Sequence, residues 1–167
     1  MTRPLVLLSA LLLFCGPAYS GEIVKTPYED PKVVFDFYFD HPEKINSALY
    51  WVRSYINPLG EAPYNFSPEF MSIKVVIHGT EIVTVAKHNY EKYKNAVERM
   101  KYYDQLGVEF IVCGLAAKDY DYSTDDFQDF IKLAPSAITE LVHWQQQGYG
   151  LITPNIMDKK LSIDEIR

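Results

Sequence analysis

Several short runs of apolar residues are spaced along the chain, and their composition is that of strands buried on both faces. Three of them, Val33–Phe39, Ile73–Ile77 and Val108–Cys113, are rich in β-branched and aromatic residues. A later run, Tyr149–Thr153, is stopped by Pro154. A weaker run, Phe130–Ala134, fits either a short strand or the end of a helix. The pattern therefore predicts four or five strands.

Helical periodicity fills the intervals between these runs. Apolar residues three and four positions apart predict a helix that Pro42 opens and that Asn57-Pro58 ends. A second helix begins at Asn89 and ends at Gly107, a residue type that commonly terminates helices.

The last predicted helix starts at Ser136 and closes at Gly148, with Ile138, Leu141 and Trp144 facing inward. Two segments are less regular. Residues 59–68 contain several helix breakers and predict a loop, and residues 81–87 favour a short helix or turn over a strand.

Strands that alternate with helices in this order predict βαβ units. We therefore expect an α/β fold of three layers, a mostly parallel sheet of about five strands with helices on both faces. No repeat or linker divides it, so we expect one domain over residues 32–155. An extended leader, 21–31, precedes this domain and a charged tail, 156–167, follows it.

The first twenty residues have the pattern of a cleaved secretory signal. Arg3 supplies the positive start, Pro4–Phe14 the apolar run, and Ala18 and Ser20 the small residues before a cut ahead of Gly21. The apolar run is too short for a bilayer, which needs about 20 residues. We therefore expect a signal peptide over 1–20, a secreted or periplasmic protein, and no membrane span.

Charge narrows the range of partners. Removing Arg3 from 16 basic residues leaves 15 against 22 acidic residues, a formal charge of −7 for residues 21–167. Nucleic acids and anionic membranes attract basic surfaces. The composition therefore argues against both as partners.

Cysteine content points to one candidate residue. The chain has two cysteines, and Cys15 leaves with the signal peptide, so Cys113 cannot form an intramolecular disulfide. It is a buried inert thiol, an intermolecular bridge or a reactive group.

The third strand ends at Cys113, and the second is followed by His78. Because one helix separates these strands, we expect them to be neighbours whose carboxyl ends meet at the edge where α/β folds place their ligands. The attacking species of a reactive cysteine is the thiolate, which the N–H groups after the strand and a His78 imidazolium would stabilise. Gly114 would leave the sulfur reachable. The alternatives are a packed Cys113 and a purely structural His78.

No metal or cofactor is expected. A zinc site from His78, His88 and Cys113 lacks close ligand spacing. The acidic loop 118–126 lacks the glycine and the terminal glutamate of a calcium loop. The chain also has no glycine-rich phosphate loop and no Gly-x-Ser-x-Gly sequence.

The cysteine segment also carries a resemblance. Gly107–Cys113, followed by Ala116-Ala117, resembles the segment that holds the sulfur-accepting cysteine in the DsrE/DsrF-like (TusD-like) sulfur-relay family. His78-Gly79 and the stretch from Pro135 to Pro154 resemble the exported branch of that family. The resemblance covers residues 33–154. It implies a DsrE-like sheet, assembly into homotrimers or hexamers, and a cysteine that carries sulfane sulfur as a persulfide.

The chain departs from the better understood family members, which are cytoplasmic and have a basic rather than an acidic segment after the cysteine. Two hypotheses remain. The first is an exported sulfur carrier or thiol sulfurtransferase that uses Cys113 and His78, with a thiol protein or small thiol as sulfur donor or acceptor. The second is a non-catalytic oligomeric module that binds a small molecule or a protein partner at the same sheet edge.

Overall fold

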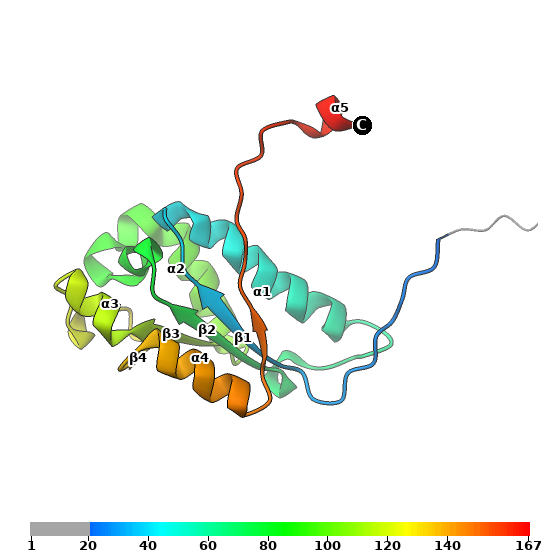
Figure 1. Ribbon diagram of the computed structural model, residues 1–167, viewed down its shortest axis with the longest axis horizontal. Coiled ribbons are helices and arrows are strands. Elements are labelled where there is room, and N and C mark those ends of the chain that lie inside the picture. The colour runs from blue at the N-terminus through cyan, green and yellow to red at the C-terminus, as the bar shows by residue number, and fades with distance from the viewer. Residues whose placement is uncertain (1–20) are drawn as a thin grey trace, which may run out of the picture.

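Five parallel strands form a single sheet in the order β4-β3-β2-β1-β5 (Figure 1). The computed structural model describes residues 21–167, so the predicted signal peptide, 1–20, lies outside the described residues. The predicted α/β class and its roughly five-stranded parallel sheet are confirmed. The strands are β1 (Lys32–Phe37), β2 (Ser72–Ile77), β3 (Glu109–Cys113), β4 (Ile131–Ala134) and β5 (Gly150–Ile152).

Helices cover both faces of the sheet, as predicted. The long helices α1 and α2 pack on one face, and α4 packs on the other, so the molecule has three layers (Figure 1). No helix within residues 21–167 combines the length and the apolar character needed to cross a membrane. The helices are α1 (Ile45–Gly60), α2 (Tyr90–Gln105), α3 (Gly114–Asp119), α4 (Ala137–Gln146) and α5 (Ile163–Ile166). Short 3₁₀ turns occur at Pro42–Lys44, Pro68–Phe70, Thr80–Val85, Lys87–Asn89 and Thr124–Asp126.

The larger core lies between the sheet and the helices α1 and α2. Because side chains of a strand alternate between faces, Phe35, Ile73 and Phe110 all point to this side. They are fully buried against apolar residues of α1 and α2, including Leu49 and Val97. Burial on this scale gives the sheet a fixed frame for the residues that follow its strands.

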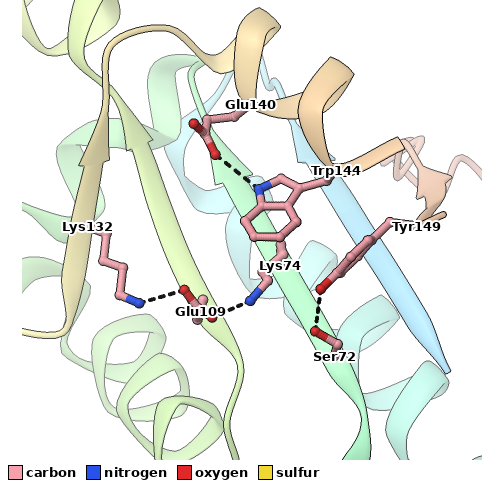
Figure 2. A network of polar contacts seen from close by, with 7 residues as sticks. All are labelled: Ser72, Lys74, Glu109, Lys132, Glu140, Trp144 and Tyr149. Carbon is pink, nitrogen blue, oxygen red and sulfur yellow. Dashed lines mark hydrogen bonds and ion pairs between the residues drawn. The ribbon is translucent and has the colours of Figure 1, made fainter. Parts of the chain in front are cut away.

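The face under α4 is divided into two halves. Near the carboxyl ends of the strands it is apolar, and near the amino ends it carries a network of polar contacts (Figure 2). Lys74 is only 6% exposed, and its ammonium group pairs with Glu109, which also accepts a hydrogen bond from Lys132 at 2.6 Å. The Lys74 nitrogen lies 4.6 Å from the centroid of the Trp144 ring on α4.

Two further contacts attach this end of α4 to the sheet. The indole N–H of Trp144 donates to Glu140 at 3.0 Å, which fixes the ring over Lys74 (Figure 2). The hydroxyl groups of Tyr149 and Ser72 lie 2.5 Å apart, so the segment after α4 is joined to β2. The helix is therefore anchored at its carboxyl end by polar contacts and at its amino end by apolar packing.

Two details of the predicted helices are wrong. Ile138 was expected to face inward but is 62% exposed, and Ala137 is buried in its place. The first long helix does not stop at Asn57-Pro58 but continues to Gly60, because Leu59 is buried and holds the last turn against the core. The uncertain segment 81–87 is mostly 3₁₀ helix, in agreement with the prediction of a helix or turn.

Candidate functional site

His78 and Cys113 lie at the same edge of the sheet, as the sequence predicts. Strands β2 and β3 are parallel neighbours, and Ile77 pairs with Val112 in their register. The next residues are His78, which directly follows β2, and Cys113, which is the last residue of β3. Paired positions of a parallel sheet point to the same face, so both residues belong to the face that α4 covers.

Cys113 lies less open to solvent than we expected. Its side chain is 6% exposed and packs with Val34, Val76, Ala137 and Leu141. The expectation that Gly114 leaves the sulfur readily reachable is therefore wrong for this conformation. The reason is that Ala137 and Leu141 of α4 cover the strand end. Gly114 serves close packing, since a Cβ atom there would lie 2.9 Å from the carbonyl oxygen of Ala134.

The backbone after the cysteine turns into a helix. Cys113 is the N-cap residue of α3, which begins at Gly114. The first N–H groups of a helix have no partner within the helix. The thiol thus lies at the start of α3 without a capping hydrogen bond to it, and apolar side chains of α4 cover it.

His78 is bonded toward β1 and not toward the thiol. Its Nε2 donates to a carboxylate oxygen of Asp36 at 2.7 Å. Its ring stacks on Tyr38, with 4.8 Å between the centroids and an angle of 20° between the planes. The second Asp36 oxygen accepts a hydrogen bond from Thr153 at 3.3 Å. Asp36 and Tyr38 therefore fix the position of the imidazole.

A hollow of about 490 Å³ opens at this edge beside His78. Its walls include Tyr38, Asp119 and Tyr120, so it combines aromatic faces with a carboxylate. Ala116 also lines it and packs against the cluster that contains Cys113. The thiol is therefore behind the wall of this hollow rather than on its surface.

Glu81 fixes the backbone from which His78 projects. This glutamate is fully buried and accepts three backbone hydrogen bonds, from Phe39 at 3.0 Å, from Gly79 at 2.9 Å and from His78 at 3.3 Å. Burial raises the pKa of the Glu81 carboxyl, and these N–H groups oppose the rise. The carboxylate thus joins the ends of β1 and β2.

Gly79 is required for the same joint. A Cβ atom at Gly79 would lie 2.4 Å from the backbone nitrogen of Phe39 and 2.5 Å from a Glu81 oxygen. No side chain fits into this space. The fold therefore requires glycine after His78, whatever the chemical role of the histidine.

The other expected candidates lie elsewhere. Within residues 21–167, no group of three histidine, cysteine or acidic side chains is placed to hold a metal ion. His88 packs against the ring of Tyr122, with 5.5 Å between the centroids. In the acidic loop, Asp126 accepts two hydrogen bonds from Ser123 and forms a capping box.

Three residues of this edge, Asp36, Tyr38 and Glu81, were not predicted from the sequence. Asp36 gave the clearest signal, because a lone carboxylate interrupts an otherwise apolar strand. Nothing local marked Glu81, since one of its donors comes from a strand end 42 positions earlier.

Comparisons with known proteins agree with this fold. A solved structure of a protein of unknown function from Methanobacterium thermoautotrophicum superposes with a TM-score of 0.60 at 20% sequence identity, covering 75% of this chain and 100% of that one. At this identity the likeness concerns the fold alone. No curated protein matches the sequence. The model of the DsrE/DsrF-like family matches residues 32–154, which include β1–β5 and both candidate residues. The chain therefore belongs to the DsrE/DsrF-like family.

Proposed function

We propose that the protein is an exported sulfur carrier, or thiol sulfurtransferase, that holds sulfane sulfur as a persulfide on Cys113. The observation that carries the proposal is the position of Cys113. It is the one cysteine of residues 21–167 and it ends a central strand of a DsrE/DsrF-like domain. Cys113 and His78 each come directly after the paired residues Val112 and Ile77. Sulfur relay is characteristic of this family, and the pattern of residues 1–20 supports export.

The proposed reaction needs no oxidant. The Cys113 thiolate attacks the outer sulfur of a donor persulfide, R–S–SH, and a new S–S bond forms as the donor S–S bond breaks. The electron pair of the broken bond leaves with the donor as R–S⁻, and Cys113 becomes Cys–S–SH. An acceptor thiolate then attacks the outer sulfur and releases the Cys113 thiolate again.

The role of His78 follows from its position. Asp36 and Tyr38 orient the ring, and the imidazole lies on the same face and edge as the thiol. In the proposal it stabilises the thiolate and gives a proton to the leaving sulfur. Asp36 and Tyr38 are positioning residues, because their contacts are with the ring.

Access to the thiol sets the size of the donor. The side chains that cover Cys113 are small or come from the first two turns of α4. A small displacement of these turns would admit a small persulfide or polysulfide, whereas a folded partner would need a larger opening. We therefore favour a small persulfide or polysulfide as the donor.

Alkylation kinetics test the reactive state of the thiol. We expect a small alkylating agent to modify native Cys113 at neutral pH, and the His78→Ala variant to react more slowly and to need a higher pH. A thiol that reacts only after denaturation would contradict the proposal. An unchanged curve of alkylation rate against pH in His78→Ala would remove His78 from the mechanism.

A second candidate is a non-catalytic module that binds a small molecule at the same edge. The hollow beside His78 favours it, because its walls contain Tyr38, Asp119 and Tyr120 but not Cys113. Under this candidate the cysteine only packs, and Cys113→Ser would bind the same ligands as the original chain.

Assembly into a homotrimer or hexamer is also part of the proposal. It is supported by the family resemblance and by apolar side chains that face solvent around α4 and β5, namely Ile138, Val142 and Leu151, which are 62%, 48% and 44% exposed. Light scattering on the purified protein would measure the mass. A monomer at all concentrations would contradict this part.

A further inference from the structure

A second hollow lies away from the carboxyl edge, on the side of the sheet that α1 and α2 cover. It is a groove of about 740 Å³ between α1, α2 and the segment after β5. This volume falls within the range of about 300 to 1,000 Å³ that is usual for small-molecule sites. The groove contains neither Cys113 nor His78, so a ligand bound there would be independent of the proposed sulfur chemistry.

The charge of this groove is opposite to that of the chain. Arg53, Arg99 and Lys159 line it, and its lining contains no aspartate or glutamate. Within residues 21–167 none of these three cations forms an ion pair with a carboxylate. Three cations without counter-ions are notable in a chain of formal charge −6. A bound anion would supply the missing charge.

Both arginines are oriented by α1 before any ligand arrives. A guanidinium N–H of Arg99 donates to the backbone oxygen of Asn46 at 2.9 Å. The Arg53 guanidinium carbon lies 4.6 Å from the centroid of the Tyr50 ring. Each contact uses only part of the five N–H donors of the group, and the remaining donors suit a carboxylate, phosphate or sulfonate.

The rest of the wall is aromatic and has one unmet polar group. Tyr50 and Trp51 are 54% and 40% exposed, so their rings are open to a ligand, and Tyr103 forms a buried wall at 6%. The side-chain oxygen of Asn46 is buried without a hydrogen-bond partner among the described residues. A ligand that carries a hydroxyl or amino group could satisfy it after a small rotation of the side chain.

From these features we propose that the groove binds a small organic anion, namely a carboxylate, phosphate or sulfonate on a flat apolar group. The guanidinium groups recognise the anionic group, and the rings of Tyr50 and Trp51 receive the flat part. Lys159, from the segment after β5, adds a third positive charge at the rim. Because the chain has a net negative charge, anions are disfavoured at the rest of its surface and should bind preferentially in this groove.

A pair of dyes tests both parts of this recognition. Anilinonaphthalene sulfonate carries a flat ring system and an anionic group, and phenylnaphthylamine is its uncharged counterpart. We expect the purified protein to bind the sulfonate more tightly, and salt to weaken binding of the sulfonate alone. Equal affinity for the two dyes at low salt would overturn the proposal.

Variants locate the binding. Arg53→Gln together with Arg99→Gln should weaken sulfonate binding by about tenfold or more, since each removes charge-assisted hydrogen bonds. Lys94→Gln is the matched control, because it removes one cation from the exposed surface of α2 outside the groove. If the double variant binds the sulfonate as tightly as Lys94→Gln does, the site is elsewhere. If the double variant does not fold, sulfonate binding is measured with Arg53→Gln alone. Arg53 is exposed, so its replacement should leave the fold intact.

Discussion

Replacing Glu81 with glutamine tests the joint that holds the ends of β1 and β2. The carboxylate is fully buried and has three backbone N–H donors, one on one oxygen and two on the other. Glu81→Gln keeps the shape of the side chain and turns one acceptor oxygen into an NH₂ donor. In the better of its two orientations, the glutamine carbonyl still accepts the hydrogen bonds from the N–H groups of Gly79 and His78. Its NH₂ group then faces the N–H group of Phe39, which is also a donor.

The magnitude follows from that loss. One buried N–H group loses its acceptor, which costs about 1–3 kcal/mol. The neutral amide also accepts weaker hydrogen bonds from Gly79 and His78 than a carboxylate does, but it costs less to desolvate, and these two changes oppose each other. We therefore expect Glu81→Gln to lower the free energy of unfolding by about 1–3 kcal/mol. For a chain of this size, that corresponds to a fall of about 2–12 °C in Tm.

Urea unfolding at neutral pH, followed by tryptophan fluorescence, measures this change. Glu91→Gln is the matched control, because Glu91 is exposed on α2 and the same replacement there should change stability by less than about 0.5 kcal/mol. If both variants are as stable as the original chain, Glu81 does not hold the two strand ends together. In the same variant we expect slower alkylation of Cys113, since the loss of the Phe39 hydrogen bond loosens the joint from which His78 projects.

Three other changes probe the sheet and the helix that covers it. Leu141→Ala should speed alkylation of Cys113, because it removes a side chain that covers the thiol. Val142→Ala should not, because Val142 is 48% exposed. Equal alkylation rates in the two variants would show that α4 does not limit access to Cys113. Burial raises the pKa of Glu109, but bonds from two lysines outweigh it and hold the pKa below its ordinary value of 4.5. The ionised Glu109 carboxylate therefore stabilises the fold above about pH 4.5, and this contribution is lost as pH falls further. Between pH 7 and pH 3, the free energy of unfolding from urea titrations should fall less for Glu109→Gln than for the original chain. Gly79→Ala should lower the free energy of unfolding by about 1–3 kcal/mol in the same assay, since its methyl group has no room, and unchanged stability would contradict this.

The arrangement of strands and helices could be predicted from the sequence because it depends on local signals. The run Ile73–Ile77 is apolar and β-branched, as befits a strand buried on both faces, and Gly107 has the positive φ of 92° that ends a helix. The placement of His78 and Cys113 at the same edge of the sheet then followed from the geometry of a βαβ unit.

The environment of the two candidate residues could not be predicted in the same way. The burial of Cys113 depends on how α4 lies across the sheet, and that depends on contacts such as Trp144 over Lys74, which join residues 70 positions apart. The inward face of α4 was partly misjudged for the same reason. Ile138 and Ala137 are adjacent, and only the packing of the helix decides which one is buried.

The central claim is that Cys113 accepts sulfane sulfur, and intact-mass spectrometry tests it most directly. After incubation with a small polysulfide, we expect the native protein to gain the mass of one sulfur atom. The gain should map to Cys113, disappear on treatment with a thiol reductant, and be absent from Cys113→Ser at equal folded content. A native protein that gains no sulfur, or a Cys113→Ser variant that gains as much, would contradict the claim.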